Sequence, residues 1–152
     1  MNGGAVISKC GKYRYTLERK WCEGPTVLWV MLNPSTADAE KDDPTIRRCI
    51  AFSQREDFGS LIVENLYAYR STDPSTIARM GAAEARGPEN FMRMVDSAAR
   101  AEYVICAWGT PGGKYIPQAL ESFKLRCLGR TKHGAPKHPL YLAKTTPLEA
   151  FP

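Results

Sequence analysis

Short apolar runs separated by polar stretches dominate the pattern of this chain. The first run, Val27 to Leu32, is rich in β-branched and aromatic residues and stops at Asn33-Pro34. Such a run predicts a strand that is buried on both faces, as in a parallel sheet covered by helices. Pro34 ends the strand because proline has no N–H to donate to a sheet ladder. Asn33 and the polar residues after it are therefore expected at the carboxyl end of this strand.

Three further apolar runs predict buried strands of the same kind, over residues 61–69, 103–108 and 125–129. Residues 13–19 alternate between polar and apolar positions and are rich in strand-forming side chains, which is typical of an edge strand. The chain therefore contains enough predicted strands for one central sheet.

Helical patterns lie between these strands. Asp43-Pro44 supplies an N-cap and a first helical residue, and the apolar stripe that follows predicts a helix ending at Gly59. Residues 90–101 have helical spacing, residues 115–123 predict a short helix, and residues 132–142 have no period. Strands that alternate with helices predict a single α/β domain over residues 1–152, with a mostly parallel central sheet covered by helices on both faces.

Composition adds few restrictions to this picture. The 152 residues are 43% hydrophobic and 24% charged, as in soluble globular proteins. The formal charge of +5 is compatible with a nucleic-acid partner, and equally with a basic surface kept for solubility. No apolar run approaches the roughly 20 residues that span a bilayer, so we expect no membrane partner. Five cysteines without a C-x-x-C pair fit free thiols in a reducing cytoplasm, so we expect a cytoplasmic protein.

Three polar residues near the predicted strand ends are candidates for catalysis. Asn33 can orient a water or a substrate amide, and the alternative is that it caps the turn before Pro34. Asp38 can act as a general base, and the alternative is a solvated charge or helix cap. His138 can donate a hydrogen bond to an oxygen that gains charge in a transition state. The alternative for His138 is a surface histidine without a role.

The remaining candidates flank these three residues. Aromatic side chains at strand ends can stack on a base or simply pack in the core. Basic side chains on the same rim suit phosphate contacts, and also any soluble surface. The candidate substrate-binding residues are Pro34, Ser35, Thr36, Asn65, Tyr67, Arg70, Trp108 and Gly109, and the candidate nucleic-acid-binding residues are Lys132, Lys137, Leu140 and Tyr141.

Motifs for other chemistry are absent. Cys127, His133 and His138 match no zinc spacing. The glycine-rich loop at residues 109–113 matches neither the P-loop nor the dinucleotide fingerprint. We therefore expect neither a metal nor an organic cofactor.

A series of motifs resembles family 1643 of the domains of unknown function, which is found mainly in bacteria and phages. The motifs occur in one order along nearly the whole chain, as MLNPSTAD, DDPTIRRC, VENLYAYR, GPEN, AWG and LGRTKHGAPKHPLYL. This resemblance brings no settled activity with it.

A more distant resemblance is to the uracil-DNA glycosylases, which share an α/β sandwich with one motif after the first core strand and another in a late loop. Residues 31–35 are similar to the Gly-Ile-Asn-Pro-Gly motif of the mismatch-specific and thymine-specific branches. Residues 137–140 are similar to the His-Pro-Ser-Pro motif of the uracil-specific branch. The first motif lacks its usual glycines here, with Ser35 in place of the last one, and Leu140-Tyr141 stand where the late motif has Ser-Pro.

This second resemblance implies a three-layer sandwich that acts on a nucleobase in DNA or in a nucleotide and hydrolyses an N-glycosidic bond. Asn33 would orient the attacking water, Asp38 would be a possible base, and His138 would stabilise the departing base. Tyr67 or Trp108 would stack on a base flipped out of the helix, and Leu140, Tyr141 or Leu142 would fill its place. Two alternatives stay open. One is a non-catalytic nucleic-acid- or partner-binding module on the same fold, and the other is an enzyme acting on free nucleotides.

Overall fold

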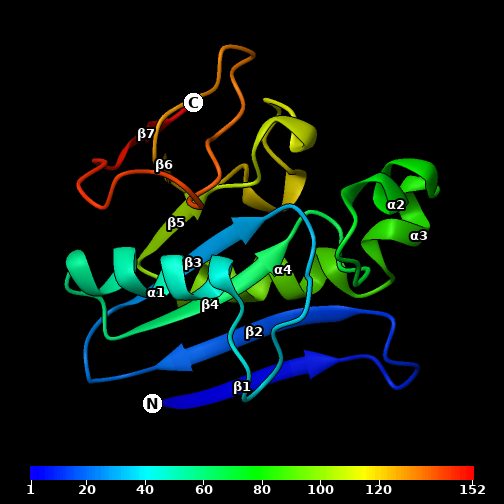
Figure 1. The fold of residues 1–152 in the computed structure, drawn as a ribbon, viewed down its shortest axis with the longest axis horizontal. Helices are drawn as coiled ribbons and strands as arrows, with labels where there is room; N and C mark the ends of the chain where they lie inside the picture. Colours follow the sequence, from blue (N-terminus) through cyan, green and yellow to red (C-terminus); the bar gives the residue numbers. More distant parts are fainter.

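A seven-stranded sheet crosses the molecule in the order β1-β2-β4-β3-β5-β6-β7 in the computed structural model, which describes residues Met1–Pro152 (Figure 1). The four predicted buried strands are all present and are adjacent in this sheet. The strands are β1 (Asn2–Ile7), β2 (Arg14–Lys20), β3 (Thr26–Met31), β4 (Ser60–Asn65), β5 (Tyr103–Cys106), β6 (Leu125–Cys127) and β7 (Glu149–Phe151).

The sheet is mixed, so the prediction of a mostly parallel sheet is wrong. β4, β3, β5 and β6 run parallel to one another, whereas the β1–β2, β2–β4 and β6–β7 pairs are antiparallel. β1 and β7 were not predicted because they are edge strands whose residues are largely exposed and carry no apolar run. β2 is an interior strand and not the predicted edge. Its polar residues Arg14, Thr16 and Arg19 are buried, and the sequence pattern does not distinguish them from solvated ones.

The principal helices begin where the sequence predicts. α1 (Pro44–Arg55) has Asp43 as its N-cap, and the carboxylate accepts a hydrogen bond from the Ile46 N–H at 2.9 Å. The other helices are α2 (Pro74–Arg79), α3 (Ala82–Arg86) and α4 (Asn90–Arg100). Two predictions are only approximate, because α1 ends at Arg55, before Gly59, and residues 115–123 contain only the 3-10 turn Gln118–Leu120. Pro117 explains the second difference, since proline disfavours helical backbone in the residue before it.

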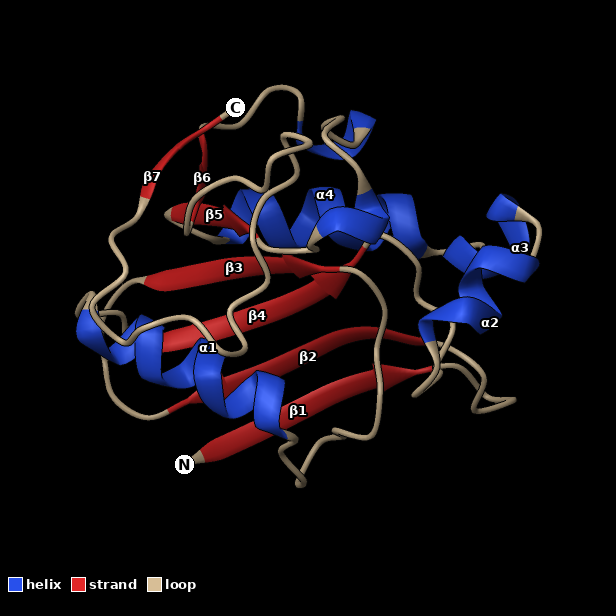
Figure 2. Cartoon of the chain, turned by 45° about the horizontal axis from the view of Figure 1, so that its top comes forward, coloured by secondary structure: helices blue, strands red, loops and turns tan.

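Helices cover both faces of the sheet, as predicted, with α1 on one face and α4 on the other (Figure 2). Successive side chains of β3 therefore enter two different cores. Trp29 and Met31 lie in the core beneath α1, whereas Leu28 and Val30 lie in the core beneath α4. No helix of the structure has the length and apolar composition needed to cross a membrane.

The order of the parallel strands places a switch point between β3 and β5. The chain leaves β3 through α1 to reach β4 on one side, and then returns through α4 to β5 on the other side. Connections that diverge in this way open a crevice at the carboxyl ends of the two strands, where open α/β sheets bind ligands.

Candidate functional site

A cavity of about 410 Å³ lies at this switch point. Its walls come from the carboxyl ends of β3 and β4, the loop after β5, the start of α1 and the loop that carries His138. Buried side chains, including Met31, Val63 and Asn65, form what we call the floor, and exposed residues such as Thr72 and Thr110 form the rim. The cavity is large enough for a small organic ligand.

Asn33 lines this cavity and also fastens a neighbouring loop. Its Nδ2 donates hydrogen bonds to the Ser71 carbonyl at 2.9 Å and to the Pro34 carbonyl at 3.1 Å. The side-chain oxygen Oδ1 receives no hydrogen bond from the protein. Both readings of Asn33 therefore have a structural counterpart, because the nitrogen stabilises the turn and the oxygen is left to accept a hydrogen bond from a water or ligand.

His138 lines the same cavity from the late loop. Its Nδ1 accepts a hydrogen bond from the Leu140 N–H at 3.1 Å, so the neutral ring carries its proton on Nε2. Burial lowers the pKa of His138 below its usual 6.5, and the carboxylate of Asp43 opposes this shift. The imidazole is therefore neutral at pH 7 and has one N–H to donate.

The structure brings Asp43, and not Asp38, to the cavity. The carboxylate of Asp38 accepts hydrogen bonds from the N–H groups of Glu40 and Lys41, and these bonds lower its pKa. Asp43 is 9% exposed, and one of its oxygens caps α1. Asp38 thus closes a turn outside the cavity, and the cap of α1 is Asp43.

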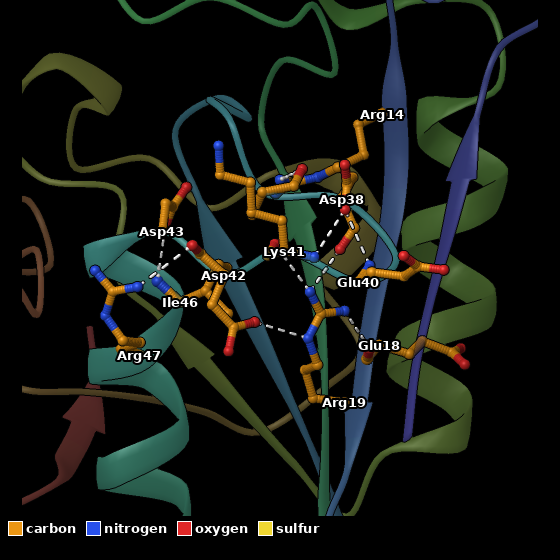
Figure 3. A network of polar contacts seen from close by, with 11 residues as sticks. Arg14, Glu18, Arg19, Asp38, Glu40, Lys41, Asp42, Asp43, Ile46 and Arg47 are labelled. Atoms are coloured by element: carbon orange, nitrogen blue, oxygen red, sulfur yellow. Dashed lines mark hydrogen bonds and ion pairs between the residues drawn. The ribbon is translucent and has the colours of Figure 1, made fainter. Parts of the chain in front are cut away.

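Arg19 holds the segment between Asp38 and Asp42 in place (Figure 3). Its Nε pairs with the Asp42 carboxylate at 2.8 Å, and its terminal nitrogens donate to the carbonyls of Asp38 and Lys41 and to that of Glu18. The guanidinium is 3% exposed, and bonds of this kind satisfy a buried charge. This network fixes the path of the chain from Asp38 to the start of α1.

Asn65 is the least satisfied polar side chain of the floor. It ends β4 and is 1% exposed, yet neither its amide nitrogen nor its amide oxygen has a hydrogen-bond partner. A buried amide without partners costs free energy, commonly about 1–3 kcal/mol, and such groups are rare in folded proteins. A ligand in the cavity that offers one donor and one acceptor would satisfy both atoms.

The remaining candidates divide into two groups. Ser35, Trp108 and Gly109 line the cavity, whereas Pro34, Thr36, Tyr67 and Arg70 do not. Trp108 is also a core residue, as its alternative interpretation expected: its Nε1 donates to the Gly113 carbonyl at 2.6 Å, and its ring packs edge-on against Phe151. Gly112 must be a glycine here, because an added Cβ would lie 2.1 Å from the Trp108 ring.

Two arginines of α1 hold the loop that follows His138. Arg48 donates to the carbonyls of Pro139 and Leu142, and Arg55 donates to those of Lys144 and Thr146. Before His138, Lys132 and Lys137 are exposed; after it, Leu140 is half-buried and Tyr141 is 94% exposed. The loop that carries His138 is therefore fixed by α1, while its tip faces solvent.

Sequence reasoning missed several lining residues, namely Arg14, Thr45, Ser71 and Thr72. Arg14 lies inside a predicted strand, Thr45 lies inside a predicted helix, and Ser71 and Thr72 follow a predicted strand, but none belongs to a motif of known chemistry. Asp43 was identified only as a helix cap, and nothing in its local pattern indicates that it faces a cavity. No group of three or more His, Cys, Asp or Glu side chains is placed to hold a metal ion.

Comparison with known proteins gives one match. The model of the family described as "Protein of unknown function (DUF1643)" matches residues 14–140, which include every element from β2 to β6 and the late loop as far as Leu140. No curated protein and no solved structure matches the chain.

Proposed function

The chain belongs to the DUF1643 family, and we propose that it is a uracil-DNA-glycosylase-like domain that hydrolyses the N-glycosidic bond of a nucleobase in DNA or in a nucleotide. One observation carries the proposal: Asn33 and His138 line the same cavity. These residues belong to the two motifs that resemble those of the uracil-DNA glycosylases, after the first core strand and in a late loop. The two motifs would need to meet around one substrate, and both border this cavity.

The cavity offers the groups that such a hydrolysis needs. Water attacks the anomeric carbon, and the bond to the base nitrogen breaks with its electron pair leaving on the base. The free Oδ1 of Asn33 accepts a hydrogen bond from this water and orients it. The carboxylate of Asp43 takes the water proton, which finally reaches the base. The Nε2–H of His138 donates to an oxygen of the departing base as negative charge develops there.

Asn65 supplies the means to recognise the base. Its unpartnered Oδ1 can accept from a ring N–H, and its unpartnered Nδ2 can donate to the adjacent ring carbonyl. This pair of groups is present in oxo-bases and is reversed or lost in amino-bases. A ligand that lacks the pair leaves a buried amide unsatisfied, which discriminates more strongly than a difference in size.

The tip of the His138 loop is suited to contact a nucleic-acid duplex. Tyr141 is 94% exposed and has a left-handed backbone, with φ of 71°. Leu142 instead packs against the core beneath α1, so Tyr141 is the residue that would fill the space left by a flipped base. Lys132 and Lys137 are exposed and available for phosphates.

A screen of oligonucleotides tests the proposal. Single- and double-stranded DNA carrying uracil, mismatched thymine or modified bases is incubated with the protein and with Asn33→Ala and His138→Ala. We expect abasic product that falls by roughly 10²–10⁴-fold in each variant. Asp38→Asn is the matched control, because its side chain lies outside the cavity.

The other outcomes of the screen identify the alternatives. Oligonucleotide binding without product, unchanged in both variants, would indicate a non-catalytic binding module. Cleavage of nucleosides or nucleotides without action on DNA would indicate an enzyme for free nucleotides. Since Asn33 also holds Ser71, the thermal stability of Asn33→Ala must be measured before its loss of product is interpreted.

A further inference from the structure

Arg14 is a buried cation without an anionic partner. The residue is 2% exposed, and its side chain makes one hydrogen bond, from Nη1 to the Ala37 carbonyl at 2.9 Å. Its Nε has no partner, and no carboxylate lies within ion-pairing distance. Burial lowers the pKa of Arg14 to about 10, which leaves it protonated at pH 7. A buried charge of this kind is costly unless something neutralises it.

A β-bulge directs this cation toward the cavity. Val6 pairs with Thr16 but Ile7 pairs with Arg14, so Tyr15 is an extra residue in β2. Thr16 faces α4, where its hydroxyl donates to Glu64, and regular alternation would point Arg14 to the same side. The bulge turns Arg14 to the α1 side instead, where it contacts Ala37 and lines the cavity with Asn65. Bulges beside functional sites commonly re-aim a side chain in this manner.

Arg19 on the same strand shows what a structural arginine looks like in this protein. It is equally buried, but it pairs with Asp42 and donates to three backbone carbonyls. Arg14 has one such bond and opens onto a cavity whose lining also includes the unpartnered amide of Asn65. Asp43 lines the cavity as well and offsets part of the charge at longer range.

We propose that Arg14 is an anion-binding residue of the cavity, and that the natural ligand presents a negatively charged oxygen to it at the floor, beside Asn65. The inference rests on the proposed function for the location of the ligand, and it adds the chemistry that the ligand must carry. Two sources supply such an oxygen, namely the oxo group of a base that ionises or departs as an anion, and the phosphate of a nucleotide.

The experiment uses the intact protein and three probes. Inorganic phosphate represents the phosphate source, 5-nitrouracil represents an oxo-base that is ionised at neutral pH, and thymine is the neutral control. The Nε–H signal of Arg14 is followed by NMR in the unmodified protein, with its assignment taken from Arg14→Lys. Affinities are measured by calorimetry for the protein, Arg14→Lys, Arg14→Gln and the exposed charge control Arg47→Gln.

We expect an anionic probe to shift the Arg14 signal and to bind roughly 10- to 100-fold more weakly to Arg14→Gln than to Arg14→Lys. Arg47→Gln should bind as the unmodified protein does. A response to 5-nitrouracil assigns the oxygen to the base, and a response to phosphate assigns it to a nucleotide. If neither anion moves the signal, or if Arg14→Gln binds them unchanged, the inference is overturned. The NMR measurement decides the matter even if Arg14→Gln fails to fold.

The outcome is separate from that of the glycosylase screen. If the protein forms abasic product but its Arg14 responds to no anion, the proposed function stands and the inference about Arg14 is overturned. If anion binding depends on Arg14 but no product forms from DNA or nucleotides, the inference about Arg14 stands and the proposed function is overturned.

Discussion

The backbone N–H of Leu140 donates a hydrogen bond to Nδ1 of His138, and the two nitrogens lie 3.1 Å apart. This bond fixes the tautomer of the neutral imidazole, because Nδ1 can accept only when the ring proton is on Nε2. If Nδ1 were also protonated, its N–H would face the N–H of Leu140 and the hydrogen bond between them would be lost. The turn after His138 and the protonation state of the ring are therefore coupled.

Acidification is expected to break the hydrogen bond between the Leu140 N–H and Nδ1 as His138 becomes protonated. Burial lowers the pKa of this imidazole below 6.5, so the folded state prefers the neutral ring. The associated stability is complete above pH 6.5 and is lost as the pH falls through the lower pKa of the folded state. The ¹⁵N shifts of the imidazole, followed against pH, should show an Nε2–H tautomer at pH 7 and a midpoint below 6.5. A midpoint above 6.5 would contradict this account.

Asp43→Asn is expected to lower activity by roughly 10²-fold or more, whereas Asp38→Asn should leave it unchanged. Both substitutions keep an oxygen that can accept the local backbone hydrogen bonds, so the cap of α1 and the turn at Lys41 persist. Only Asp43 lines the cavity. Rates of product formation and the thermal midpoint of each variant provide the measurement. Equal losses in the two variants would remove Asp43 from the mechanism.

Arg48→Ala should loosen the loop after His138. The guanidinium donates to the carbonyls of Pro139 and Leu142 and lies over the Phe52 ring, with its carbon 5.1 Å from the ring centre. Amide hydrogen exchange at Leu140 and Leu142 is therefore expected to accelerate, and ligand affinity to fall, with little change in the exchange of the sheet.

Arg47→Ala is the matched control for Arg48, because Arg47 is an exposed neighbour on the same helix whose side chain donates a hydrogen bond only to the Asp42 carbonyl, at 3.3 Å. It should leave exchange at Leu140 and Leu142 unchanged. Acceleration of the same size in both variants would mean that α1 as a whole, and not Arg48, holds the loop.

Glu64 should make the free energy of unfolding fall, and the protein less stable, as the pH rises. It is fully buried, its Oε1 accepts from the hydroxyls of Thr16 and Ser97 at 2.8 and 2.6 Å, and its Oε2 has no partner. Burial raises its pKa from 4.5 to about 7, so the folded state holds the proton more tightly than the unfolded state. This contribution is complete below pH 4.5 and is lost as the pH rises through about 7, a change of about 3 kcal/mol.

Glu64→Gln is the test of this carboxyl group. The amide can still accept from both hydroxyls but does not titrate between pH 4 and pH 8. Denaturant unfolding at these two pH values gives the free energy of unfolding of each protein. Between pH 4 and pH 8 this free energy should fall by about 3 kcal/mol more in the unmodified protein than in the variant. A parallel fall in both would assign the effect to other groups.

The core of the fold follows from local sequence. Apolar runs on β3, β4, β5 and β6 predict buried strands because both of their faces must leave water. The Asp43-Pro44 pair predicts the start of α1 because capping depends on a few adjacent residues. The mixed character of the sheet does not follow from local sequence, since the outer strands β1 and β7 are largely exposed and are defined by the strands they pair with.

The site required the tertiary structure for most of its content. Sequence alone identified Asn33, Asn65 and His138 as polar residues beside strand ends and loops, where ligands commonly bind. Only the fold shows that they line one cavity together, that Asp43 lies in it while Asp38 does not, and that a bulge at Tyr15 brings Arg14 to its floor. The reason is physical. The hydrophobic period of a segment determines whether it forms a strand or a helix. Which face of the sheet a side chain lies on, and which residues it contacts there, depends on segments far away in the chain.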